Sequence, residues 1–125
     1  MTLRLLATLF FVLVGVVNLL PVVGVLGVDR LESLYGFSLA GEELLLLLRH
    51  RAVLFGLLGA FIVLSAFRTQ WRPAATFAGL VSMVAFAVLA LPIETHNEAM
   101  QRVFWVDVGA IVLLLIAYGL SRIRQ

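Results

Sequence analysis

The chain has 125 residues, of which 63% are hydrophobic and only 13% are charged, whereas roughly a quarter of the residues of a soluble domain carry charge. The nine basic residues are arginines scattered along the chain, so the high isoelectric point does not indicate the clustered basic surface of a nucleic-acid-binding protein. The absence of cysteine excludes disulfides, a thiolate nucleophile and a thiolate metal site.

Four long apolar stretches fill most of the chain and match the roughly 20 residues that a helix needs to cross a bilayer. Continuous rather than alternating apolar runs favour helices over a barrel. We therefore predict an all-α membrane protein, a single four-transmembrane-helix bundle that forms one domain over residues 1–125. The expected helices cover about 3–22, 43–67, 73–92 and 103–121, with outer loops at 23–42 and 93–102.

The distribution of charge predicts the orientation of the bundle. All seven acids lie in or beside the two expected outer loops, and the remaining helix ends are purely basic. The positive-inside bias then puts both termini in the cytoplasm. The prediction is a multi-pass protein of the cell inner membrane, with the lipid bilayer as its first partner. The arginines at the basic ends are Arg4, Arg68, Arg72, Arg122 and Arg124.

The first stretch carries one polar residue deep within it, Asn18. Its apolar run is longer than the core of a signal peptide and no small-x-small cleavage site follows, so we expect a retained helix. The next loop is long for so small a protein. Within this loop, residues 28–35 form either a plain connector or a short amphipathic turn on the membrane surface.

The second stretch carries a stripe of small residues on one face, which predicts close approach of a neighbouring helix. The stripe consists of Ala52, Gly56, Gly59 and Ala60. Glu42 and Arg49 lie almost on the same line, so an acid and a base are expected above the packing face. Arg51 is expected on the opposite side, with its charge extended to the headgroups.

The last stretch contains Asp107 about one turn inside its start. An aspartate in a membrane helix is costly and faces the bundle interior with a partner. We predict a direct ion pair with Arg49, at comparable depth, with Arg102 or a bridge through Glu42 as alternatives. Such a pair either belongs to a site or is only a clamp that fixes helix packing.

Two histidines, His50 and His96, fall on the outer side. Histidines on facing membrane helices ligate haem, and histidine with carboxylates such as Glu94 holds divalent metals. Their spacing matches no local metal signature, so we interpret them as interfacial residues and assign no metal or cofactor.

The run from Arg49 to Leu57, RHRAVLFGL, and the spacing of Asn97, Arg102 and Asp107 resemble a group of short bacterial inner-membrane proteins. That group commonly carries the label phosphopantetheine adenylyltransferase. The enzyme of that name is a soluble α/β protein with an HxGH-type motif, and this chain has neither its strands nor that motif. The resemblance thus implies a four-helix membrane protein and no adenylyltransferase activity. In outline only, the chain is also similar to DoxX-like membrane proteins.

These observations predict a non-enzymatic membrane protein with a polar pocket on the outer side. The pocket binds a small or lipid-like ligand, or docks a membrane partner or a second copy of the chain. A membrane redox or metal-dependent enzyme subunit using His50 and His96, and a purely structural assembly subunit, remain alternatives. No serine lies in an activating motif, so no catalytic residue is assigned. The expected pocket residues are Asn18, Glu42, Arg49, His50, Glu94, His96, Asn97, Arg102 and Asp107.

Overall fold

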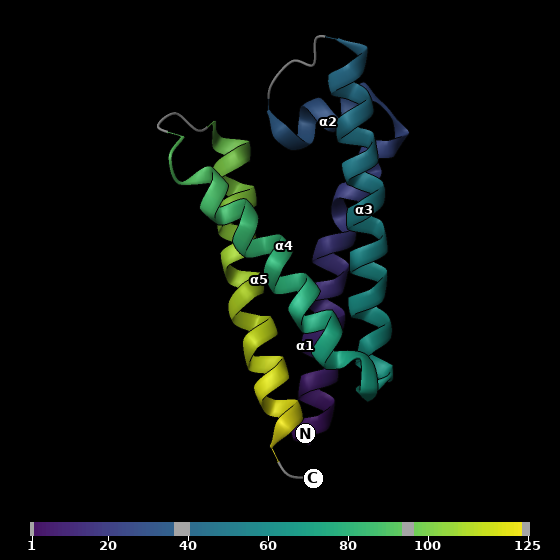
Figure 1. Cartoon of the computed structure of the whole chain (residues 1–125), viewed down its shortest axis with the longest axis vertical. Helices are drawn as coiled ribbons and strands as arrows, with labels where there is room; N and C mark the ends of the chain where they lie inside the picture. The colour runs from purple at the N-terminus through teal and green to yellow at the C-terminus, as the bar shows by residue number, and fades with distance from the viewer. Residues whose placement is uncertain (1, 37–40, 94–96, 124–125) are drawn as a thin grey trace.

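The computed structural model describes residues 2–36, 41–93 and 97–123, and Figure 1 shows helices running alternately up and down. The elements are α1 (Leu3–Leu19), a 3₁₀ segment (Leu20–Leu26), α2 (Val28–Tyr35), α3 (Glu42–Phe67), a 3₁₀ turn (Thr69–Trp71), α4 (Arg72–Ala90) and α5 (Glu98–Arg122). Four segments are long and apolar enough to cross a membrane: Leu3–Leu26, Glu42–Phe67, Thr69–Ala90 and Glu98–Arg122. The predicted all-α, four-membrane-helix bundle is confirmed, and the described ranges contain no strand.

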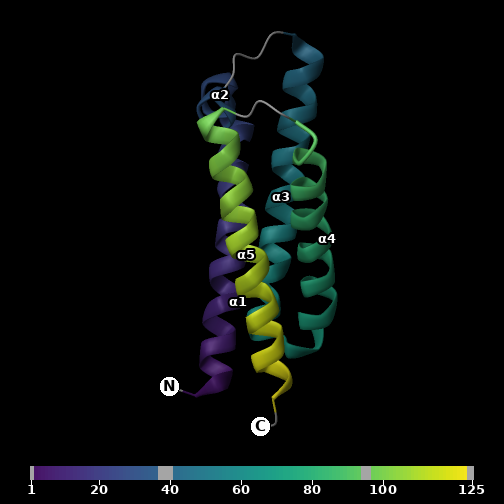
Figure 2. The same ribbon diagram turned by 90° about the vertical axis from the view of Figure 1, so that its left-hand side faces the viewer.

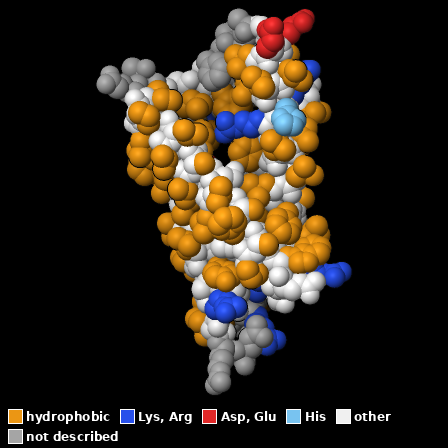
Figure 3. Space-filling view, viewed as in Figure 1, with side chains coloured by type: hydrophobic (Ala, Val, Ile, Leu, Met, Phe, Trp, Pro, Cys, Tyr) orange, Lys and Arg blue, Asp and Glu red, His pale blue; other side chains and the backbone are white. Residues whose placement is uncertain are grey.

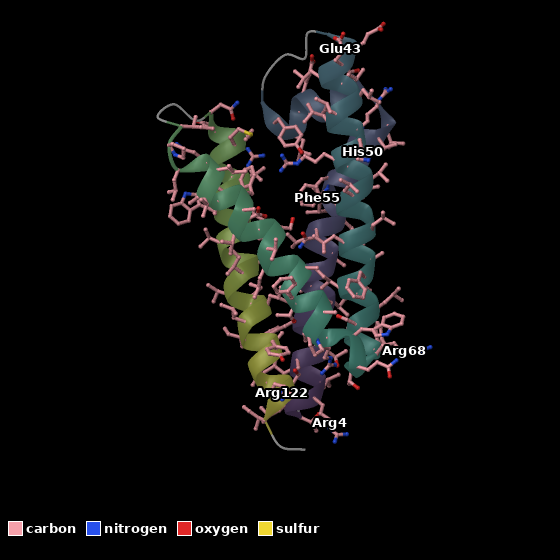
Figure 4. All side chains as sticks on the ribbon, viewed as in Figure 1. Arg4, Glu43, His50, Phe55, Arg68 and Arg122 are labelled. Carbon is pink, nitrogen blue, oxygen red and sulfur yellow. The ribbon has the colours of Figure 1, made fainter. Side chains whose placement is uncertain are left out.

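Both chain termini lie at the same end of the bundle, in two views at right angles (Figures 1 and 2). The connection between α3 and α4 also lies at this end. Figure 4 labels Arg4, Arg68 and Arg122 at this basic end, and Glu43 at the opposite end. The charge separation expected along the chain is therefore a separation in space.

Helix boundaries differ most from the expectation at the opposite end from the termini. The first helix continues beyond residue 22 as the 3₁₀ segment, which has Pro21 in its first turn. The amphipathic alternative for residues 28–35 matches α2, which ends at Gly36 in the left-handed conformation (φ 74°). α5 starts at Glu98 because the Asn97 side chain accepts the Met100 amide hydrogen as an N-cap (2.7 Å). Arg102, expected in a loop, therefore lies on α5.

α1 and α3 form the closest contact between helices, because glycines let their backbones meet. A Cβ atom on Gly59 would lie 2.7 Å from the Gly15 carbonyl oxygen, and one on Gly15 would lie 2.9 Å from the Gly59 carbonyl oxygen. Neither atom can yield, since both belong to helix backbones. This crossing shows why small residues occupy this line of α3.

The core lies where all four long helices meet, in the half nearer the termini. Phe11 from α1, Ile62 from α3, Met83 from α4 and Leu114 from α5 are fully or almost fully buried there. Toward the other end, α3 and α4 diverge (Figure 1). The seam between α3 and α4 is thus closed at one end only.

Candidate functional site

A lateral cavity of about 370 Å³ lies between α3 and α4, where the two helices diverge. Its lining is mostly apolar, with Arg51 at one end and Ser82 as the other polar side chain. A second hollow of about 180 Å³ lies on the other side of Arg51, toward Ile93 and Met100. Figure 3 shows a basic side chain within this opening, surrounded by hydrophobic atoms. Arg51 therefore lines both hollows, together with Phe86 and Leu89.

Three aromatic rings surround the Arg51 guanidinium. Its Cζ atom lies 5.1 Å from the centre of the Phe55 ring, 5.4 Å from Phe86 and 5.7 Å from Tyr35. The rings come from α3, α4 and α2, and Figure 4 shows Phe55 on the side of α3 that faces the opening. Cation–π contacts of this kind stabilise a poorly hydrated charge. Three separate elements thus hold Arg51 at the cavity.

Arg51 also faces a small hollow of about 40 Å³, whose mostly apolar lining includes the polar side chains of Asn18, Tyr35 and Asp107. Asn18 is buried and donates to the Val14 carbonyl oxygen (2.9 Å). Asp107 is half-buried, and the charge of Arg51 acts on its carboxylate. Of the residues expected in the pocket, Asn18 and Asp107 are brought together here.

Tyr35 closes this hollow from α2 and is 5% exposed. Burial raises the pKa of the Tyr35 phenol above its ordinary value, because an apolar environment disfavours the phenolate. The positive charge of Arg51 lowers this pKa and the negative charge of Asp107 raises it. The net effect is a pKa above the ordinary value of 10.0, with burial as the largest cause.

The predicted ion pair between Arg49 and Asp107 is wrong, since Arg49 is exposed and Arg51 is the arginine that faces Asp107. At about 100° per residue, Arg51 lies about 100° from Ala52, on the side of Phe55 and Ile62. Arg49 lies about 60° away on the other side. The small-residue stripe marks the contact with α1 and with the 3₁₀ segment that follows it, whereas α3 also faces α4. The expectation that Arg51 points away from the bundle is corrected for the same reason.

The remaining candidates lie away from the hollows. Glu42 is exposed at the start of α3, and His50 is exposed further along the same helix. Arg102 is exposed on α5. Glu94 and His96 lie outside the described residues, so the histidine–carboxylate metal alternative stays untested. Within the described ranges, no group of three metal-ligating side chains occurs.

Asn97 connects α2 to α5. Its side-chain amide donates to the carbonyl oxygens of Tyr35 (2.9 Å) and Gly36 (3.2 Å), while its oxygen caps α5. Asn97 thus holds the end of α2, which carries the Tyr35 ring that contacts Arg51. We call this ring the aromatic wall of the Arg51 site; Asn97 itself lines none of the hollows around Arg51.

The packing stripe on α3 is narrower than expected. Ala52 and Gly59 are buried, and a Cβ atom on Gly56 would lie 2.9 Å from Val22 Cγ2. Ala60 is exposed, because it lies about 80° from Ala52 on the side away from α4.

Sequence reasoning did not assign to the site the four residues that form it, Arg51 and the three aromatic residues around it. A usable signal was present, since Arg51, Phe55, Leu58 and Ile62 follow the i, i+4, i+7, i+11 spacing of one helix face. Phe86 and Tyr35 had no such signal, because only the tertiary structure brings α4 and α2 to this face. The residues missed are Tyr35, Arg51, Phe55 and Phe86.

Comparison with family models, with curated proteins and with solved structures finds no match to this chain. The resemblance based on the run from Arg49 to Leu57 stays a prediction. The site is accordingly interpreted from its own geometry.

Proposed function

We propose that this protein is a multi-pass protein of the bacterial inner membrane that binds a lipid-like ligand in the cavity between α3 and α4. The observation that carries the proposal is the cation at one end of a largely apolar cavity between two membrane-length helices. An ionisable side chain at such a place is a mark of function, because its desolvation is costly unless a partner or ligand compensates. The proposal assigns no catalytic residue.

The composition of the cavity favours an amphiphile over a small polar solute. Its apolar lining suits a hydrocarbon body, and Arg51 suits a polar head. The cavity opens sideways between α3 and α4, so a ligand enters it directly from the bilayer. The hydrocarbon part of the ligand is then not exposed to water during binding. The apolar lining residues are Leu54, Phe55, Leu58, Ala85, Phe86 and Leu89.

A cavity-filling substitution tests this function. Ala85 is exposed and lines the cavity on α4, so Ala85→Trp would occupy the space without removing charge. Ala74→Trp is the matched control, because Ala74 is also exposed on α4 and lines none of the three hollows around Arg51. Native mass spectrometry of both variants, purified in mild detergent, should show retained lipid only in Ala74→Trp. Equal retention in the two would contradict the proposal.

The proposed orientation has both termini in the cytoplasm, since the end that carries Arg4, Arg68 and Arg122 is basic. The Arg51 site then belongs to the outer half of the bilayer. Because the chain has no cysteine, single cysteines at Gln70, Gln125 and Glu43 report the topology directly. An impermeant thiol reagent applied to intact cells lacking an outer membrane barrier should label only Glu43→Cys. Labelling of Gln125→Cys would show that the C-terminus lies outside and would contradict the proposed orientation.

A further inference from the structure

We infer that the ligand is a lipid of the surrounding bilayer with an anionic phosphate head, bound at Arg51. This inference rests on the proposed lipid-binding function and names the chemistry of its head. Three features of the site support it: the free donors of Arg51, its depth along the helices, and the position of Asp107.

The Arg51 guanidinium has five N–H donors in a planar fork that matches phosphate oxygens. No hydrogen bond or ion pair joins Arg51 to another residue in the described part of the chain. The rings of Tyr35, Phe55 and Phe86 make cation–π contacts with Arg51, which leave its N–H donors without an oxygen acceptor among the described residues. A half-buried cation whose donors are accepted by no described residue, beside a cavity, therefore favours an oxyanion over a neutral head.

The depth of Arg51 matches a lipid head, and the cavity continues inward as a chain would. Arg51 lies about 14 Å along α3 from Glu42, and across the cavity it is flanked by Phe86 and Leu89 near the end of α4. From Arg51 the lining reaches Leu58, about 10 Å deeper along the axis. A phosphate at Arg51 thus lies near the end of α4, well inside α3, while an acyl chain follows the α3–α4 seam.

Asp107 is the internal anion that opposes this head. It faces the hollow on the inner side of Arg51, so it neutralises part of the charge that a phosphate would contact. Like charges near one cation repel each other. Asp107 therefore weakens binding of an anionic lipid, and replacing it with asparagine should strengthen binding.

A headgroup competition on the full chain tests the inference. The protein is incorporated into nanodiscs that contain equal amounts of phosphatidylglycerol and phosphatidylcholine with identical acyl chains, and bound lipid is counted by native mass spectrometry after release. The wild-type chain should retain phosphatidylglycerol over phosphatidylcholine by about tenfold or more, because both lipids carry a phosphate but the choline ammonium of phosphatidylcholine cancels its charge and weakens the interaction with Arg51. Arg51→Gln should abolish this preference, and Asp107→Asn should increase it severalfold. Arg49→Gln is the matched control, because it removes the same charge from an exposed position on the same helix.

Each outcome bears on a separate step. The wild-type preference needs no variant, so misfolding of Arg51→Gln cannot mask a negative result. A wild-type chain without headgroup preference, or an Arg51→Gln chain that keeps it, overturns the anionic head even when Ala85→Trp loses all lipid. Displacement of the lipid by inorganic phosphate alone would mean that the acyl chain of the lipid contributes nothing to the affinity. This result would overturn the lipid as the occupant of the site. Equal lipid retention by Ala85→Trp and Ala74→Trp would instead contradict the binding function itself.

Discussion

Arg72 and Arg51 are both arginines on membrane helices packed against phenylalanine, yet the bundle uses them differently. Arg72 is 5% exposed, and its Cζ atom lies 5.1 Å from the Phe11 ring centre. Its guanidinium donates to the carbonyl oxygens of Ser65 (3.2 Å) and Ala66 (2.7 Å) and to the Thr8 hydroxyl (3.0 Å). Arg51 has aromatic contacts but no such acceptors among the described residues.

The difference follows from what each arginine faces. The last carbonyl groups of α3 have no partner within the helix and carry the negative end of its dipole. Arg72, at the start of α4, satisfies two of them and ties α4 to α1 through Thr8. Its donors are occupied internally, so it closes the basic end. Arg51 faces hollows instead, and no residue in the described part of the chain accepts its donors where the bundle is open.

The largest effect is expected at the closed end. Arg72→Met should lower the free energy of unfolding by about 3 kcal/mol, because it leaves buried carbonyl groups without donors. Arg68→Met, an exposed arginine in the same connection, is the control and should change little. Thermal unfolding in detergent measures both. Equal midpoints for the two variants would remove the structural role given to Arg72.

The crossing of α1 and α3 should tolerate substitution nearly as poorly. Gly59→Ala should lower the thermal midpoint strongly, since its Cβ atom would meet backbone at 2.7 Å. Gly56→Ala should cost less, because its Cβ atom meets only a valine side chain. Gly109→Ala should be neutral, as nothing lies within 4 Å of the Cβ position. A different order among these glycines would mean that α1 and α3 pack otherwise.

Arg51→Met should cost only about 1 kcal/mol of stability, the range of its cation–π contacts. The loss should be clearly smaller than for Arg72→Met in the same thermal assay. A loss as large as that of Arg72→Met would make Arg51 a second structural clamp, and the contrast between the two ends would disappear.

The smallest effect concerns the wall of the open site. Because burial raises the pKa of Tyr35 above its unfolded value of 10.0, the folded state holds the phenolic proton more tightly. This contribution to stability is complete below pH 10 and is lost as the pH rises through the folded pKa. Unfolding between about pH 9 and 11 should therefore show a steeper loss for wild type than for Tyr35→Phe. Identical slopes would mean that Tyr35 is open to water.

Hydropathy alone predicts the four helices, because membrane length and composition leave few other structures. The same reasoning recognises Asp107 and Asn18 as buried polar residues, since each interrupts a long apolar run. The helix periodicity predicts Arg49 rather than Arg51 as the partner of Asp107 only if α3 has a single packing face. In the structure α3 contacts both α1 and α4. The hydrogen bonds of Arg72 could not be predicted for a different reason. Its acceptors are carbonyl groups that lack a helical partner only because α3 ends there.

Asn97 couples the end of α2, which carries Tyr35, to the start of α5. One amide group caps α5 through its oxygen and holds the end of α2 through its nitrogen. A shift of Tyr35 that breaks the second interaction also loosens the first, and an N-cap is worth about 1 kcal/mol. Occupancy beside Tyr35 and fraying of residues 98–101 are therefore thermodynamically linked. Amide hydrogen exchange at the first turn of α5 reads out, from a distance, what happens next to Arg51.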